Sequence, residues 1–276
     1  MARPAFTEQL RAAQARADSL LCVGLDPEPA RFPPPWRDDP TKIFDFCARI
    51  VDATHDLVCA FKPQIAYFAA FRAEEQLERL VAHVRRVAPQ VPVILDAKRG
   101  DIGATAEMYA REAFERYDAD ALTLSPFMGF DSIEPYLRHD GRGLFLLCRT
   151  SNPGGSDLQA QRLQGGERLY EHIARLAAGP WNRNGQLGLV VGATFPPELA
   201  RVRELAPTLP LLVPGVGAQG GDAAATVGAG WRAGGPIVVN SARAVLYAAA
   251  DAGFAAAARG VASSTRAALN AARGVN

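Results

Sequence analysis

Eight short apolar runs recur along the chain, and amphipathic stretches separate them. The runs lie at residues 20–25, 57–62, 91–96, 121–125, 143–148, 188–193, 210–215 and 236–240. Near-continuous apolar runs are typical of parallel strands that are covered on both faces. Strands that alternate with helical stretches indicate repeated βα units. Eight such units predict an α/β fold of the closed (β/α)8 type, a TIM barrel.

The length and the helical stretches agree with this architecture. A chain of 276 residues is typical of one α/β barrel. The stretch 74–87 places Leu77, Leu80, Val81 and Val84 along one stripe, as an amphipathic helix requires. Because the sequence shows no linker and no shift in composition, we expect residues 1–276 to form a single barrel domain.

The charges exclude several classes of partner. Lys and Arg (30) nearly balance Asp and Glu (29), which gives a net charge of +1 and no broad basic field for nucleic acid or acidic membranes. The first residues carry charges throughout, and no apolar stretch approaches the length that spans a bilayer. We therefore expect a cytoplasmic protein that binds neither nucleic acid nor membrane.

The cysteines and histidines do not predict a metal site. Four cysteines lack any C-x-x-C spacing, and we expect them to be buried, reduced thiols. Four histidines are scattered without ligand spacing.

Polar residues stand at the ends of the predicted strands. Asp26 follows the first run, Lys62 ends the second, and Asp96 with Lys98 ends the third. Strand ends converge on one mouth of a barrel, so we expect these four side chains to lie close together. Asp96 and Lys98 are two apart, and an extended backbone points both the same way. An ion pair that merely closes the barrel is the plain structural interpretation, but a desolvated charge cluster is costly unless it is used.

Asp101 and Thr105 extend this group. They are four apart at the start of a helix predicted over 101–117, so they share one helical face. Asp101 could act as an N-cap. Beside Lys98 it becomes a candidate fourth member of the charged array.

A second motif lies at residues 213–222, "VPGVGAQGGD". Gly215, Gly217 and Gly220 satisfy G-x-G-x-x-G, but the motif follows the seventh run, and the region of Asn240 lacks the acidic ribose ligand of a dinucleotide site. Glycines before a helix still let backbone N–H groups approach a phosphate. Arg243, after the eighth run, can bind a phosphate with two hydrogen bonds. The motif thus predicts a phosphorylated small molecule as ligand.

With these residues, the chain resembles the orotidine 5'-phosphate decarboxylase family from the first strand to the eighth. "DAKRGDIGAT" matches the family's D-x-K-x-x-D signature and its continuation. "FKPQ", "RTSNPGG" and "VPGVGAQGGD" resemble the form found in one bacterial branch. The resemblance implies conversion of orotidine 5'-phosphate (OMP) to UMP and CO2 in de novo pyrimidine biosynthesis, with no cofactor and no metal.

The resemblance also implies roles for individual residues. The charged catalytic array would be Lys62, Asp96, Lys98 and Asp101, with Lys98 as the proton donor. Asp101, Ile102 and Thr105 would reach across a homodimer interface into the partner's site. The substrate-binding residues would be Asp26 and Lys62 at the ribose hydroxyls, Ser151 at the pyrimidine, Gln219 and Arg243 at the phosphate, and Pro214, Gly215 and Asn240 beside them.

Two alternatives remain open at this stage. A sugar-phosphate lyase or synthase of the same barrel superfamily also carries D-x-K-x-x-D, but it uses a divalent metal bound by carboxylates. The other alternative is not an enzyme but a non-catalytic, phosphate-binding barrel. Such a protein should have lost a member of the charged array, and all four members are present here.

Overall fold

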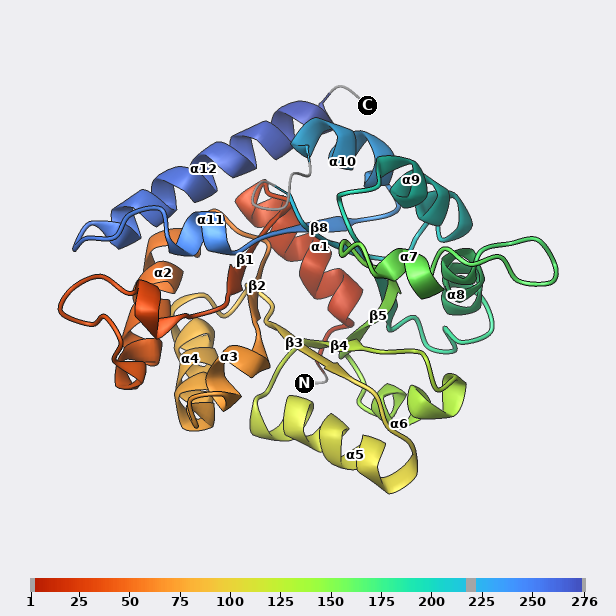
Figure 1. Ribbon diagram of the computed structural model, residues 1–276, viewed down its shortest axis with the longest axis horizontal. Coiled ribbons are helices and arrows are strands. Elements are labelled where there is room, and N and C mark those ends of the chain that lie inside the picture. The colour runs from red at the N-terminus through yellow and green to blue at the C-terminus, as the bar shows by residue number, and fades with distance from the viewer. Residues whose placement is uncertain (1–2, 217–221, 275–276) are drawn as a thin grey trace.

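The computed structural model describes residues 3–216 and 222–274. Eight parallel strands form one sheet in the order β2-β1-β8-β7-β6-β5-β4-β3, and helices surround it (Figure 1). The strands are β1 (Leu21–Leu25), β2 (Ala60–Pro63), β3 (Ile94–Arg99), β4 (Ala121–Leu124), β5 (Gly143–Arg149), β6 (Leu187–Val191), β7 (Leu211–Pro214) and β8 (Ile237–Ser241). The predicted (β/α)8 barrel is confirmed.

The sheet closes into a barrel between β2 and β3, which stand at the two ends of the strand order. Parallel bridges join Phe61 to Val93 and Gln64 to Asp96, which brings β2 against β3. Closure leaves every strand with two neighbours, so the carboxyl ends of all eight strands meet at one face.

The helices cover the outside of the barrel, and α4 follows the predicted stripe, with Leu77, Leu80, Val81 and Val84 buried. The described helices are α1 (Phe6–Ala17), α2 (Ile43–Thr54), α3 (Ile65–Ala69), α4 (Glu74–Val87), α5 (Gly103–Arg111), α6 (Glu134–Leu137), α7 (Gly155–Leu158), α8 (Leu169–Ala178), α9 (Pro196–Leu205), α10 (Ala223–Gly230), α11 (Arg243–Leu246) and α12 (Phe254–Arg273). Short 3-10 segments lie at Pro29–Arg31, Pro40–Lys42 and Phe130–Ser132, and a π-helical segment at Glu112–Arg116 follows α5.

Helix α1 lies across the amino-terminal face of the barrel, behind the ring of strands in Figure 1. Its Phe6 and Leu10 pack against a layer to which each strand gives one residue: Cys22, Ala60, Ile94, Ala121, Phe145, Val190, Leu212 and Val238. The rings of Phe6 and Phe145 meet edge to face, with centroids 5.7 Å apart. A Cβ at Gly143 would lie 2.3 Å from the Phe6 ring, so this packing requires glycine there.

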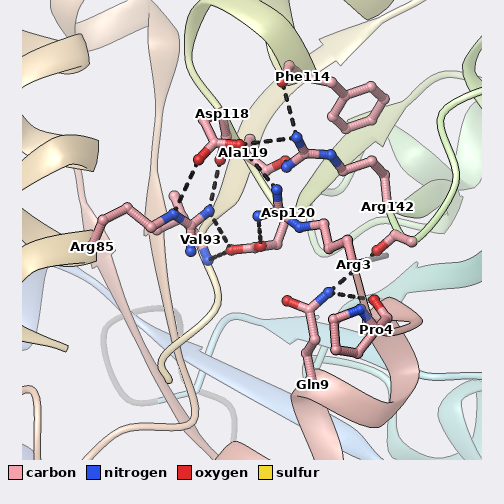
Figure 2. A network of polar contacts seen from close by, with 11 residues as sticks. Arg3, Pro4, Gln9, Arg85, Val93, Phe114, Asp118, Ala119, Asp120 and Arg142 are labelled. Carbon is pink, nitrogen blue, oxygen red and sulfur yellow. Dashed lines mark hydrogen bonds and ion pairs between the residues drawn. The ribbon is translucent and has the colours of Figure 1, made fainter. Parts of the chain in front are cut away.

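A network of ion pairs fixes the segment before α1 to the same face (Figure 2). Arg3 pairs with Asp118 at 3.0 Å and also with the fully buried Asp120. Arg85 lies 2.7 Å from Asp120, and the backbone N–H of Val93 donates to the same carboxylate at 2.7 Å. The network therefore joins the amino-terminal segment to the starts of β3 and β4.

Several strand boundaries differ from the prediction. β2 begins three residues later than predicted, because residues 55–57 form the turn after α2 and residues 58–59 connect that turn to the strand. β3 begins and ends three residues later than the predicted run 91–96, and both Asp96 and Lys98 lie within the strand. The four cysteines are free and buried, as expected. No helix among the described residues is both long and apolar enough to cross a membrane.

Candidate active site

A cavity of about 600 Å³ opens at the carboxyl-terminal face of the barrel. Most of the residues predicted for the site line it: Asp26, Lys62, Asp96, Lys98, Ser151, Pro214, Gly215, Asn240 and Arg243. They come from six different strands or from the loops that follow them. Because carboxyl ends converge in a barrel, residues that are far apart in sequence meet in one site.

Asp96 lies at the centre of the charged array. Lys62 Nζ donates to Asp96 Oδ2 at 2.7 Å, and Lys98 Nζ donates to Asp96 Oδ1 at 2.6 Å. Burial alone would raise the pKa of Asp96, but the charges of Lys62 and Lys98 outweigh it and hold the pKa well below its usual range. Asp96 is therefore an ionised carboxylate that bridges two ammonium groups.

Lys62 and Lys98 differ in exposure. The Lys62 side chain is 5% exposed, whereas that of Lys98 is 46% exposed. Burial would lower the pKa of Lys62, but Asp96 and Asp26 reverse the effect and raise it. Lys62 is thus a fixed, buried cation, and Lys98 presents its ammonium to the open cavity.

The backbone at Lys98 does not have the extended conformation expected from the sequence. Its φ is +47°, in the left-handed region, and the register with β4 shifts between Leu95 and Arg99. The expected proximity of Asp96 and Lys98 is present, but the expected reason for it was wrong. A bulge in β3, rather than the two-residue period of a strand, places the two side chains together.

Thr123 is a cavity residue that the sequence reasoning missed. It lies on β4, is 1% exposed and contacts Asp96, Ala97 and Lys98. A lone hydroxyl inside the apolar run "ALTLS" was the available signal, because a buried hydroxyl needs hydrogen-bond partners.

The described residues that line the cavity do not include Asp101, Ile102 or Thr105. Helix α5 begins at Gly103, so Asp101 precedes it and does not share a helical face with Thr105; that expectation was wrong. Asp101 accepts the N–H of Ile102 at 2.8 Å instead of capping the helix. Ile102 is 52% exposed. The three side chains therefore lie outside the cavity of their own barrel.

Two buried polar atoms at the cavity come from the loop after β1 and from β8. Asp26 Oδ1 and Asn240 Oδ1 have no hydrogen-bond partner among the described residues. Burial raises the pKa of Asp26, although Lys62 opposes this. Gly215 has φ +101° and follows β7, and Arg243 opens α11. Gln219 lies outside the described residues.

The loop after β5 forms one wall of the cavity. Ser151, Leu158 and Gln159 line it, and Gln159 Oε1 accepts the N–H of Thr150 at 2.8 Å. The buried guanidinium of Arg149 pairs with Glu198 and donates to Ser156 Oγ at 3.0 Å. The expected pyrimidine contact, Ser151, thus belongs to a loop held by side-chain hydrogen bonds.

Within residues 3–216 and 222–274, no cluster of three or more His, Cys, Asp or Glu has the arrangement of a metal site.

Eight parallel strands with a charged cavity at their carboxyl ends define an enzyme of the (β/α)8-barrel class. A family model described as "Orotidine 5'-phosphate decarboxylase / HUMPS family" matches residues 19–259. The chain belongs to this family.

Curated relatives and solved structures agree with that assignment. A protein of Methylibium petroleiphilum named orotidine 5'-phosphate decarboxylase is 76% identical, and the match covers 97% of this chain and 99% of the relative. One of the same name from Paracidovorax citrulli is 75% identical over 98% and 99% of the two chains. The structure of Leishmania donovani OMP decarboxylase superposes with a TM-score of 0.85 at 42% identity and covers 98% of both chains.

Proposed function

We infer that this protein is a carboxy-lyase that converts orotidine 5'-phosphate to UMP and CO2 in pyrimidine biosynthesis. The observation that carries the inference is the array of Lys62, Asp96 and Lys98 in the cavity of a chain whose curated relatives at 70–76% identity bear the decarboxylase name. We further propose that residues 1–276 act as one barrel domain and that the protein works in the cytoplasm.

Lys98 is the proposed proton donor. When the bond between C6 of the pyrimidine and its carboxylate breaks, the electron pair stays on C6 and CO2 leaves. A fixed ammonium beside C6 stabilises the developing negative charge and then transfers a proton to that carbon. Lys98 suits this role because its ammonium is open to the cavity and is oriented by Asp96 at 2.6 Å. Solvent then returns a proton to the amine.

The other predicted residues hold the nucleotide. We propose that Asp26 and Lys62 bind the ribose hydroxyls, with Asn240 beside them, since Asp26 Oδ1 and Asn240 Oδ1 are buried and unpartnered among the described residues. Ser151 would contact the pyrimidine. Arg243 and the backbone at Pro214 and Gly215 would bind the phosphate, together with Gln219. Binding energy from the phosphate can then be expressed in the transition state, although the phosphate lies far from C6.

Replacement of Lys98 tests the assignment. We expect Lys98→Ala to lower kcat for OMP by at least about 10³-fold, because charge stabilisation and proton transfer are both lost. UMP binding should stay within about tenfold, measured by calorimetry. Lys42→Ala, at an exposed lysine paired with Asp45, is the matched control and should leave kcat unchanged. Normal turnover by Lys98→Ala would refute the proton-donor role.

The metal-dependent alternative can be separated by the same assay. Purified protein should consume OMP at the same rate with and without excess chelator, followed by the loss of OMP absorbance. A rate that falls with chelator and recovers with a divalent cation would favour the sugar-phosphate lyase or synthase chemistry instead.

We also propose a homodimer that shares its active sites. Ile102 and Met108 of the α5 region are 52% exposed, and Phe127 and Met128 after β4 are 76% and 45% exposed. A Cβ at Gly100 would lie 3.8 Å from Met128 Cε, so these segments adjoin. Exposed apolar side chains that gather in this way mark interaction surfaces. A partner seated here would receive Asp101, Ile102 and Thr105 into its own cavity.

Mixed dimers test the shared site. Asp101→Asn and Lys98→Ala subunits should each be nearly inactive as homodimers. When the two are mixed, one of the two sites in each heterodimer regains both native groups. Because about half of the dimers in a random mixture are heterodimers, about a quarter of all sites are native, and the mixture should show about a quarter of the wild-type activity. The same mixture remaining inactive, with heterodimers verified by native mass spectrometry, would place Asp101 in its own chain's site.

A further inference from the structure

The bulge in β3 sets three residues against one residue of β4. Leu95 pairs with Leu122, and Arg99 pairs with Leu124. Asp96, Ala97 and Lys98 therefore lie opposite Thr123. An inserted segment of this kind disrupts the regular ladder and leaves its backbone groups in need of other partners.

The hydroxyl of Thr123 supplies those partners. Thr123 Oγ1 accepts the N–H of Ala97 and the N–H of Lys98, each at 3.0 Å, and donates to Asp96 Oδ1 at 2.9 Å. A threonine hydroxyl has one proton to donate and two lone pairs to accept with. All of its hydrogen-bonding capacity is thus directed at the segment that carries the charged array.

These bonds hold Lys98 at both ends. Its main chain donates to Thr123, and its ammonium donates to the same Asp96 oxygen that Thr123 bonds. The main chain at Lys98 has φ +47°, a conformation that costs energy for a residue with a Cβ and persists where its surroundings enforce it. Nothing in the Lys98 side chain itself favours that φ.

We propose that Thr123 is a positioning residue for the reaction: its hydroxyl holds the Lys98 backbone in the left-handed conformation and orients Asp96, and together these place the Lys98 ammonium. This rests on the proposed function. Thr123 acts through Lys98 and Asp96, so its loss should affect the chemical step more than nucleotide binding. A misplacement of about 1 Å in a reacting group can cost about 10²-fold in rate.

Two substitutions separate the hydroxyl from the packing of the side chain. Thr123→Val keeps the shape and removes the hydroxyl, and we expect kcat for OMP to fall about 10- to 100-fold while KM and the Kd for UMP change by less than about threefold. Thr123→Ser keeps the hydroxyl and should retain kcat within about threefold. Should Thr123→Val fail to fold, Thr123→Ala removes the same hydroxyl without adding atoms.

Thr54 provides the matched control. It is fully buried, and its hydroxyl donates to the carbonyl of Ile50 at 2.7 Å on helix α2, away from the cavity. Thr54→Val should lower the melting temperature and leave kcat unchanged.

The outcomes distinguish the two proposals. Wild-type protein that does not consume OMP refutes the proposed function. An active wild type combined with an unchanged kcat in the folded hydroxyl-free variant overturns the role of Thr123. A loss in Thr123→Ser as large as that in Thr123→Val would also overturn it, because keeping the hydroxyl would then not preserve kcat.

Discussion

Asp26 illustrates how a proposed binding residue can oppose stability. The carboxylate is largely buried in the cavity, its Oδ1 has no partner among the described residues, and burial raises its pKa. A folded-state pKa above the value near 3.9 of an unfolded Asp means that the folded protein disfavours the ionised form. The penalty is full above the folded pKa, shrinks between that value and about 3.9, and vanishes below it.

We therefore expect Asp26→Asn to raise the melting temperature of the nucleotide-free protein at pH 7. The difference from wild type should shrink as the pH falls toward about 4, measured by calorimetry across that range. The same variant should bind UMP about 10- to 100-fold more weakly, because hydrogen bonds from hydroxyls to a charged acceptor are lost. A variant that is less stable than wild type at pH 7 would show that Asp26 is stabilising in the folded protein.

For individual residues, the sequence predicted which charged side chains lie together, but it did not predict which contacts fix their positions. Asp26, Lys62, Asp96 and Lys98 could be placed together because the geometry of a barrel brings strand ends to one mouth. The role of Thr123 depends on a bulge in β3, and a bulge changes register without a clear signal in the residue types.

A tyrosine hydroxyl joins two elements of the site. Tyr247, the residue after α11, donates to the carbonyl of Asp26 at 2.9 Å and accepts the N–H of Glu28 at 2.7 Å. It thereby ties the loop after β1 to the end of the helix that begins with Arg243. Two walls of the cavity, one with the expected ribose contact and one with the expected phosphate contact, are connected through a single side chain.

Removing this hydroxyl should loosen both walls. We expect Tyr247→Phe to lower the free energy of unfolding by about 1–3 kcal/mol, because a part-buried N–H and a part-buried carbonyl lose their partner, and to raise KM for OMP. Tyr117→Phe is the matched control, since the Tyr117 hydroxyl is buried and has no partner among the described residues. Chemical denaturation and steady-state kinetics measure the two effects. Equal destabilisation in both variants would contradict the proposed tie.

Helices were easier to predict than strand limits. The stretch 74–87 was predicted from its apolar stripe, and α4 spans those residues. The start of β2 and both ends of β3 lie three residues later than predicted, because an apolar run continues through a turn as readily as through a strand. The start of α5 at Gly103 had no capping side chain to mark it.

Across the whole molecule, the cavity and the ion-pair network of Arg3 lie at opposite ends of the barrel. The cavity lies at the carboxyl ends of the strands, whereas Arg3, Asp118 and Asp120 join the amino-terminal segment to the other end (Figure 2). The Asp120 side chain is fully buried, so removing one of its cationic partners leaves a charge that is less well compensated.

We expect Arg3→Ala to lower the free energy of unfolding by about 1–3 kcal/mol and to leave kcat and KM unchanged. Arg16→Ala, at an exposed position on helix α1, which follows Arg3 along the chain, should alter stability by less than about 0.5 kcal/mol. Urea denaturation and OMP kinetics on both variants check this. A fall in kcat for folded Arg3→Ala would show that the two ends of the barrel are energetically coupled.

The apolar layer between α1 and the strands also limits the path by which carbon dioxide can leave the barrel. Phe6, Leu10 and the eight strand residues packed with them are at most 5% exposed, and interiors packed in this way contain few voids larger than a water molecule. Carbon dioxide released in the cavity would therefore not cross this layer. Both proposed products, carbon dioxide and the nucleotide, would leave at the carboxyl-terminal face of the barrel, where the cavity opens.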